Sequence, residues 1–216
     1  MSINRNDLLI DVLTRKRLTS YLEACDQNDS RALELYKWNA ELAAAFFYLL
    51  GIVEVVVRNS IDREMQTFNV TLGNQGEWFD DLTDRIDDDS NFKVRKIKAR
   101  LVSNRRSLSH GNIMSELDFG FWRSFLSRKY KDTLWRTALR FAFPHAPSRQ
   151  PEYIFARVRH LHVLRNRIAH HEPIHRRDIA SDFQICIEVL DAISPVIAQW
   201  SADNFRVLAV LAQKPT

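Results

Sequence analysis

One long apolar stripe with helical spacing constrains this sequence more than any other feature. From the polar pair Asp29-Ser30 to Phe68, apolar side chains recur every three or four residues, which is the period of an α-helix. The stripe consists of Leu33, Leu35, Tyr36, Leu42, Phe46, Leu49, Leu50, Val53, Val57 and Ile61. Because Asp29-Ser30 suits an N-cap, we predict one helix of about 40 residues ending near Phe68. The β-branched run 55–57 favours a strand locally, but the surrounding helical period outweighs it.

The rest of the chain also favours helices. Only 5 Gly and 6 Pro occur in 216 residues, and a sheet-rich fold of this size needs more turn residues. We predict an all-α fold in a single domain, residues 1–216. Its expected segments are long N-terminal helices within 6–70 (one at 6–25), a basic helix at 91–107, an aromatic-rich block at 114–143 with two short helices, a helix at 152–171, and helices within 178–212.

Two further expectations concern Gly51 and the C-terminal helices. Gly51 lies inside the long helix, where Ala is more stable by about 1 kcal/mol, so we expect it to allow close packing against another helix. Near the C-terminus we expect a helix from Asp178 to Trp200 and a last short helix capped by Ser201.

No segment predicts export or membrane insertion. The first residues lack an apolar signal stretch and a cleavage site. The longest apolar run, Leu42 to Val53, has 12 residues, and a membrane span needs about 20. Cys25 and Cys186 are too few for a disulfide framework and indicate buried thiols in a reducing compartment. We therefore expect a cytoplasmic protein without a membrane partner.

Charge is unevenly distributed, although the net charge is only +4. Residues 77–90 carry seven acids, and residues 91–110 carry seven Lys or Arg and no acid. Residues 157–177 carry six Arg, no Lys and five of the seven His. Guanidinium fits phosphate better than ammonium does, so this stretch favours an anionic partner such as nucleic acid. For the run 91–110 alone, an ordinary solvated helix face is the simpler explanation.

Common catalytic and cofactor motifs are absent. The sequence has no GxxxxGK[ST], GxGxxG, CxxC, HExxH or GxSxG, so we expect no cofactor and no metal. A metal site built from His160, His162, His170, His171 or His175 stays open as an alternative. Pro173 argues against a helical ligand pair of His171 and His175, and no Cys lies nearby.

The helix predicted at 152–171 has two distinct faces. On an ideal helix one face is apolar and consists of Ile154, Val158, Leu161, Leu164 and Ile168. Arg159, His162, Asn166 and His170 share another face, and the last three are spaced by four residues, so their side chains can align. Asn166 can hydrogen-bond a His ring and fix its tautomer. Packing explains the apolar face but not this polar stripe.

Arg, Asn and His together suit metal-independent RNA cleavage, in which the 2′-hydroxyl attacks the adjacent phosphate. His can act as base and acid near pH 7, and Arg can stabilise the phosphorane. Arg165 is about 140° from His170 around one straight helix, so the two do not converge. Either the helix distorts near Pro173 or a second copy shares the site. Satisfied surface residues without catalysis remain the structural alternative.

Three blocks of the sequence resemble one family. Arg165-Asn166 followed by His170 resembles the RNxxxH motif of the HEPN superfamily, and LRNRIAHHEPIHRRD resembles the RNxxAHHE segment of bacterial abortive-infection (Abi-like) proteins. Residues 32–65 are similar to that family's N-terminal block, with YxWN at 36–39 and ExxxRN at 54–59. Phe119 to Trp122 resembles its FGFW block. The blocks lie in family order over about residues 30–178.

The resemblance implies a HEPN-like helical bundle with an additional aromatic-rich segment, working as a homodimeric, metal-independent endoribonuclease in phage defence or as a toxin. The implied catalytic residues are Arg165 and His170, with Asn166 orienting His170 or binding phosphate. Supporting or RNA-binding residues would be Glu54, Arg58, Asn59, Arg159, His162, His171 and Glu172. We expect Arg58 to approach the site, paired with Glu54 or held in a structural salt bridge. His171 has the same local chemistry as His170, but His170 aligns with Asn166.

Two other functions remain open. A non-catalytic module would bind RNA or a nucleotide with the same Arg and His. A purely structural protein would use the aromatic block 119–143 as an interface, although such a block is more often core. A toxic nuclease also needs restraint, by an antitoxin protein, an inhibitory RNA or an autoinhibited dimer.

Overall fold

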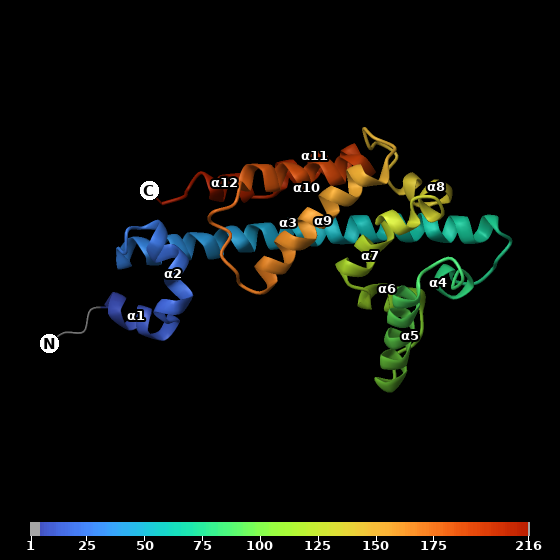
Figure 1. Ribbon diagram of the computed structural model, residues 1–216, viewed down its shortest axis with the longest axis horizontal. Coiled ribbons are helices and arrows are strands. Elements are labelled where there is room, and N and C mark those ends of the chain that lie inside the picture. The colour runs from blue at the N-terminus through green and yellow to red at the C-terminus, as the bar shows by residue number, and fades with distance from the viewer. Residues whose placement is uncertain (1–4, 216) are drawn as a thin grey trace.

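The predicted long helix is present as α3 (Asp29–Thr71) and forms the axis of the molecule (Figure 1). The computed structural model describes residues 5–215, and no strand occurs in that range, which confirms the all-α prediction. Asn28, rather than Asp29-Ser30, caps α3, because its side chain accepts a hydrogen bond from the Arg31 N–H at 3.0 Å. The helix ends where Gly73 adopts a φ of +85°, which glycine tolerates without strain.

The N-terminal segment forms two helices, so the prediction of one helix at 6–25 is wrong. α1 (Arg5–Leu13) and α2 (Arg15–Ala24) are separated by Thr14, which has a φ of 69°. The Thr14 side chain caps α2 by accepting a hydrogen bond from the Arg17 N–H. The pair packs against one end of α3.

The opposite end of α3 carries α4 (Trp78–Asp81), α5 (Asp88–Ser103), α6 (His110–Glu116) and α7 (Phe119–Phe125) (Figure 1). α5 is the predicted basic helix, displaced by a few residues towards the N-terminus. It begins at Asp88 because the Asp87 carboxylate accepts a hydrogen bond from the Ser90 N–H at 2.9 Å. The acidic run therefore supplies the cap and first turn of the basic helix.

The aromatic block is core. After α7 the chain forms short turns rather than a second full helix: 3₁₀ turns at Arg128–Tyr130 and Leu139–Ala142 flank α8 (Leu134–Thr137). The buried aromatic side chains of the block are Phe119, Phe121, Trp122, Phe125, Tyr130, Trp135 and Phe143. Among the aromatic side chains of the block, Phe141 is the exposed one. Use of the whole block as an interface is thereby excluded.

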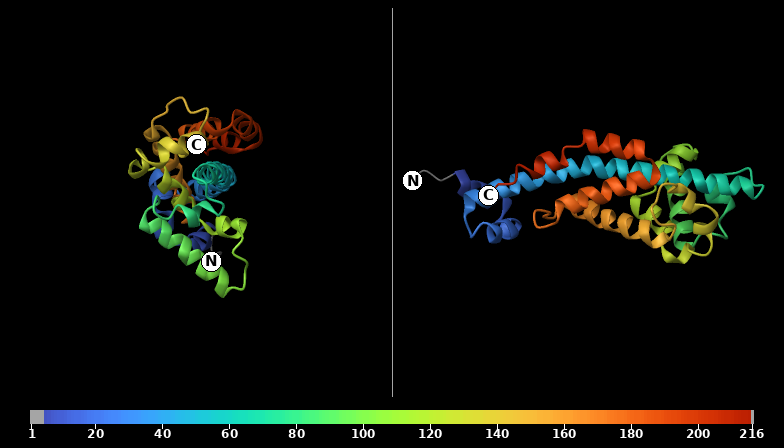
Figure 2. Two further views of the ribbon diagram at one scale, coloured as in Figure 1. Left: turned by 90° about the vertical axis from the view of Figure 1, so that its right-hand side faces the viewer. Right: turned by 90° about the horizontal axis from the view of Figure 1, so that it is seen from above.

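The C-terminal part returns along α3. α9 (Pro151–Ala169) and α10 (Ile179–Ile193) both pack on α3, and α11 (Pro195–Asn204) folds back on α10 (Figure 2). The predicted continuous helix 178–200 is wrong, since Pro195 forces Ser194 into an extended conformation. Ser201 is buried inside α11 and caps nothing, and the last helix, α12 (Val207–Leu211), follows Arg206.

One face of α3 is apolar and uncovered. Phe47, Tyr48 and Val55 are 58%, 73% and 40% exposed, and a Cβ on Gly51 would meet no atom within 4 Å. The expectation that Gly51 packs closely is therefore wrong within one chain. By length and composition, α3 is the one helix of residues 5–215 that could cross a membrane, with a mean hydropathy of 2.0 in its most apolar window, of which 33% is buried. The core helix of a soluble protein has the same signature.

Candidate functional site

α9 presents the RNxxxH residues as its amphipathic pattern predicts. All five residues of its predicted core face are buried: Ile154, Val158, Leu161, Leu164 and Ile168. Pro151 occupies the first turn, where its missing N–H costs nothing. With this face fixed on the core, Arg165 and Asn166 are half-buried and Arg159 is exposed.

Arg165 on α9 lies against Glu54 on α3. The Arg165 Nε is 3.8 Å from the Glu54 Oε2, and the two side chains retain 37% and 25% of their surface. An ion pair that is still open to solvent contributes little to stability. It does, however, place the arginine of one predicted motif beside the glutamate of the other.

Glu54 has a mixed environment. Burial raises its pKa, and the charge of Arg165 opposes that shift. Asp118, at the start of α7, also raises the pKa, whereas Arg58 and the Phe119 N–H lower it. α3, α7 and α9 therefore meet at this carboxylate.

Arg58 approaches the same place without forming the expected ion pair with Glu54. Its Nε donates a hydrogen bond to the Asn59 Oδ1 at 3.2 Å, and its charge reaches Glu54 only at longer range. Arg165 is the ion-pair partner of Glu54 instead. The ExxxRN residues thus share one surface of α3. The ion pair to this surface from another helix is made by Arg165 of α9.

His162 packs against the start of α7. Its ring centroid lies 5.9 Å from that of Phe119, and a Cβ on Gly120 would be 3.2 Å from the His162 Nε2. Burial lowers the pKa of His162, and the nearby charge of Arg123 lowers it further. The absent side chain at Gly120 allows the imidazole to approach α7 this closely.

α9 ends in a Schellman motif at the motif histidines. His170 is the C-cap, and His171 adopts a left-handed φ of 55°. The His171 N–H donates to the Ile168 carbonyl at 3.0 Å, and the Glu172 N–H donates to the Arg167 carbonyl at 2.8 Å. The helix therefore ends at the motif histidines, and this cap does not bring His170 to Arg165.

The residues after His170 are held by the fold. Arg17 on α2 donates a hydrogen bond to the His171 carbonyl. Glu172 has the partner that its position at a helix C-terminus requires, because its Oε2 lies 3.3 Å from the Arg167 Nε. His171 and Glu172 therefore fix the helix end.

Four predicted residues have side chains that the fold does not use. Within residues 5–215, the side chains of Arg159, Asn166, His170 and His171 form no hydrogen bond or ion pair. Asn166 thus does not orient His170 in the single chain. Arg165 and His170 are not in contact there either, so one chain alone does not assemble the predicted pair.

The other histidines of the Arg-rich stretch have structural partners. The His160 Nε2 lies 2.5 Å from an oxygen of the buried Asp182, which Arg177 also binds through two nitrogens at 2.7 Å. His175 is buried and stacks on Tyr21 at 4.7 Å, and burial lowers its pKa to about 4. Among the described residues, no three His, Cys, Asp or Glu side chains are placed to hold a metal ion.

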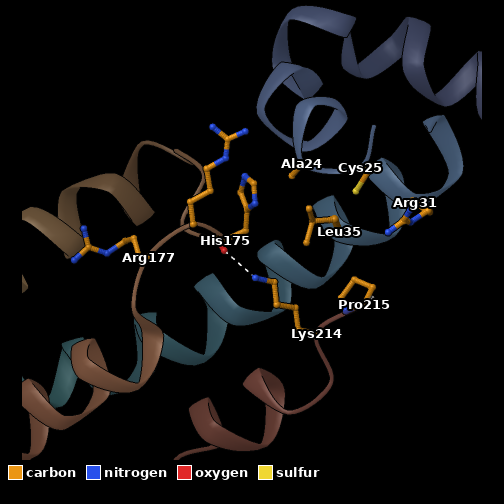
Figure 3. A pocket seen from close by; sticks show the side chains of 9 residues that line it. Ala24, Cys25, Arg31, Leu35, His175, Arg177, Lys214 and Pro215 are labelled. Carbon is orange, nitrogen blue, oxygen red and sulfur yellow. Dashed lines mark hydrogen bonds between the residues drawn. The ribbon is translucent and has the colours of Figure 1, made fainter. Parts of the chain in front are cut away.

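A cavity of about 360 Å³ lies beside His175, between α2, the start of α3 and the C-terminal tail (Figure 3). The Lys214 amine donates to the His175 carbonyl at 3.2 Å, and Arg177 points away from the cavity. Arg176 is held by the Glu23 carboxylate at 3.0 Å. These three cations connect segments of the fold, whereas Arg31, which also lines the cavity, forms no ion pair among the described residues.

The YxWN residues also join distant segments. The Trp38 Nε1 donates to the Val210 carbonyl at 2.7 Å, and the buried Asn39 Oδ1 accepts a hydrogen bond from the Ile174 N–H at 2.8 Å. Tyr36 meets Tyr21 edge to face at 5.3 Å. These contacts hold Ile174 and Val210, which follow α9 in the chain, on α3. The YxWN residues therefore position the site without lining it.

Three residues around the site were missing from the sequence prediction: Asp118, Arg123 and Lys93. Asp118 caps α7 by accepting a hydrogen bond from the Phe121 N–H at 2.7 Å. Arg123 and Lys93 both lower the pKa of His162 by their charge. Asp118 and Arg123 flank the FGFW block directly, a signal that the sequence contained. Lys93 is one of many cations in its run, and only the fold distinguishes it.

Comparison with known protein families, with curated proteins and with solved structures finds no match for this chain. The residues of the site therefore carry the functional argument.

Proposed function

We propose that this chain is a metal-independent endoribonuclease of the HEPN superfamily, similar to Abi-like abortive-infection proteins. One observation carries the proposal. Arg165 is held beside Glu54, while the polar side chains of Asn166 and His170, at the end of the same helix, take no part in the fold. Unused polar side chains next to a positioned arginine are available for a ligand, and a phosphodiester is the ligand that Arg and His suit best.

The reaction would need no group from outside the protein. His170 as base removes the proton of the 2′-hydroxyl, whose oxygen then attacks the adjacent phosphorus. Arg165 stabilises the extra negative charge of the phosphorane. The P–O5′ bond breaks as a second acid protonates the leaving oxygen. The products are a 2′,3′-cyclic phosphate and a 5′-hydroxyl.

A homodimer would supply both halves of this site. Arg165 and His170 do not meet within one chain, and in a symmetric dimer Arg165 of each copy would meet His170 of the other. Ala44, Phe47, Tyr48, Gly51 and Val55 form an exposed face of α3, hereafter the α3 stripe. The stripe runs into Arg58 and borders Glu54, so a second copy packed there would reach the Arg165 site. The bare Cα of Gly51 favours close helix approach.

The first test is RNA cleavage by pure protein in excess EDTA. Wild type should cut and leave 2′,3′-cyclic phosphate ends, whereas Arg165→Ala and His170→Ala should be slower by about 10²–10⁴. A mixture of these two variants should regain about a quarter of wild-type activity, since half of the dimers then carry one intact shared site. Equal cleavage by wild type and both variants would refute the assignment.

The second candidate is a module that binds RNA without cutting it. The separation of Arg165 from His170 within one chain favours this alternative if the protein is a monomer. Tight binding with a steep salt dependence, no cleavage and no self-association would establish it. In a nuclease used for phage defence or as a toxin, an antitoxin protein or an inhibitory RNA would provide restraint.

A further inference from the structure

Arg123 on α7 is a half-buried arginine without a partner. Its Nε is inaccessible to solvent and has no hydrogen-bond partner, and no carboxylate within residues 5–215 forms an ion pair with its guanidinium. A buried donor left unpaired costs about 1–3 kcal/mol. Arg167 also has an unpaired Nε, but Glu172 lies 3.3 Å from it. Arg123 is thus the arginine whose placement the fold does not explain.

The position of Arg123 links it to the proposed site. Gly120 and Arg123 are three residues apart on α7, so both face the same side. That side is the one His162 contacts, since a Cβ on Gly120 would be 3.2 Å from the His162 Nε2. His162 is three residues before Arg165 on α9 and shares its neighbourhood. Arg123 therefore lies next to the Arg165 site.

α5 brings a second unused cation to the same place. Lys93 acts on His162 electrostatically and, with Lys96, Asp118 and Phe121, lines a cavity of about 280 Å³ between α5 and α7. Lys93 and Lys96 form no ion pair among the described residues, and they are three residues apart on one face of α5.

Three other cations of the basic run are already occupied. Lys98 pairs with Asp80, and Arg100 and Arg106 both pair with Glu116. Arg95 is also unpaired but lies on another face of α5, so the free charge of α5 near the site is that of Lys93 and Lys96.

The local charge balance is positive. Arg123, Lys93, Arg165 and Arg58 face two carboxylates, those of Asp118 and Glu54. Asp118 is engaged by the Phe121 N–H, and Glu54 by Arg165. An anion placed between Arg123 and Lys93 would meet the unneutralised charges of the guanidinium and the amine, while the Nε itself stays inaccessible to solvent.

We propose that Arg123 and Lys93 form a second phosphate subsite, which holds the phosphate next to the one that is cut and directs the RNA strand along α5. The inference rests on the proposed nuclease function. Arg123 supplies a two-pronged donor for phosphate oxygens, and Lys93 supplies a point charge at the mouth of the cavity. In this arrangement both residues position the substrate, and the chemistry stays with Arg165 and His170.

Short substrates test the subsite directly. A dinucleotide has only the scissile phosphate, whereas a trinucleotide has one neighbour. Two trinucleotides, each with a single 2′-deoxy sugar that leaves only the first or only the second bond cleavable, cover both directions. Wild type should cut one of them with a kcat/KM about tenfold above that for the dinucleotide, mainly through a lower KM. Arg123→Gln and Lys93→Gln should lose that gain and cut the dinucleotide at the wild-type rate.

Binding provides an independent readout. With a 2′-O-methyl oligonucleotide that cannot be cut, Arg123→Gln should bind about tenfold more weakly, and the slope of log K against log salt should fall by about 0.7. Arg95→Gln is the matched control, because it removes one charge from another face of α5. Lys93→Gln changes an exposed side chain, so it keeps the test valid if Arg123→Gln unfolds.

The outcomes separate the two proposals. The subsite proposal is overturned if Arg123→Gln and Lys93→Gln bind RNA as tightly as Arg95→Gln does. It is also overturned if their kcat/KM depends on substrate length as it does in Arg95→Gln. An equal loss on the dinucleotide would overturn it too, because Arg123 would then hold the scissile phosphate. If wild type binds RNA with the predicted dependence on Arg123 but cleaves nothing, the nuclease proposal fails and the phosphate site stands.

Discussion

Arg165 on α9 and Glu54 on α3 lie 3.8 Å apart, from Nε to Oε2, and this pair joins two motifs that are far apart in the sequence. Burial raises the pKa of Glu54, so the folded protein holds its carboxylate at a cost in stability. A carboxylate whose partial burial costs stability, placed beside a positioned arginine, is typical of a functional site.

Glu54→Gln should therefore separate stability from function. A raised folded-state pKa favours the protonated form of Glu54. Its contribution to stability is therefore lost as pH rises from the unfolded-state pKa, about 4.3, through the higher folded-state pKa. We expect Glu54→Gln to unfold no more easily than wild type at pH 7, to gain relative stability as pH rises from 4, and to cut RNA more slowly. Urea titrations at several pH values measure this. Glu41→Gln, on an exposed part of α3, is the control. A clear loss of stability at pH 7 would assign Glu54 a mainly structural role.

The two adjacent histidines should respond differently to substitution. His171 has a φ of 55°, which costs a non-glycine residue about 1 kcal/mol, and its carbonyl binds Arg17 through the backbone. His171→Gly should raise the free energy of unfolding by up to about 1 kcal/mol and keep RNA cleavage. His170→Ala should keep the fold and lose cleavage by about 10²–10⁴. The opposite pattern of activity would make His171 the proton carrier.

His110 should make the α4–α6 end of the molecule sensitive to pH. Its Nε2 lies 2.9 Å from Asp62 and its Nδ1 lies 2.6 Å from Glu77, so only the doubly protonated ring can donate to both. Partial burial lowers the pKa of His110, but these hydrogen bonds outweigh it and the pKa lies above its usual value. The Lys98 amine lies 5.1 Å from the centroid of the Phe79 ring, which itself packs against the His110 ring.

Because the folded-state pKa is raised, the stabilisation by His110 is complete below about pH 6.5 and is lost as pH rises through that pKa. We expect the difference in unfolding free energy between wild type and His110→Gln to shrink over this range. Denaturant titrations from pH 5.5 to 9 would measure it. A difference that stays constant with pH would show that the ring is neutral in the folded protein.

The α3 stripe should control self-association. Tyr48 is 73% exposed, so Tyr48→Glu should keep the helical fold, convert the proposed dimer to monomers and abolish cleavage if the site is shared. Sedimentation velocity gives the oligomeric state. Val12→Glu, at an 82% exposed position on α1, is the control and should change neither property. A monomeric wild type that cuts RNA would contradict the shared site.

Asn39 should be structural although it belongs to a predicted motif. Its Oδ1 accepts the Ile174 N–H in the core, and Asn39→Ala leaves that donor unpaired. We expect a loss of about 1–3 kcal/mol in unfolding free energy, with RNA binding per folded molecule unchanged. Calorimetry and a binding titration at low temperature measure the two quantities. Loss of binding without loss of stability would place Asn39 in the site.

Local sequence determined the helical elements. The apolar period of residues 33–61 specified α3, and the five apolar positions of α9 were correctly predicted as its core face, because both patterns depend only on spacing along one helix. The breaks at Thr14 and Ser194 were missed for different reasons. Pro195 was a visible signal, whereas the positive φ of Thr14 follows from how α1 and α2 pack against α3.

Tertiary structure decided which polar residues form the site. The sequence contained Glu54, Arg58 and Arg165, but only the packing of α9 on α3 shows that Glu54 pairs with Arg165. Likewise, composition cannot distinguish Lys93 from Lys98, since one is free and the other is neutralised by Asp80 across the fold. Periodicity is a property of neighbouring residues and can be deduced from the chain. The partner of a charge is set by which helices meet, and that is fixed only when the whole core packs.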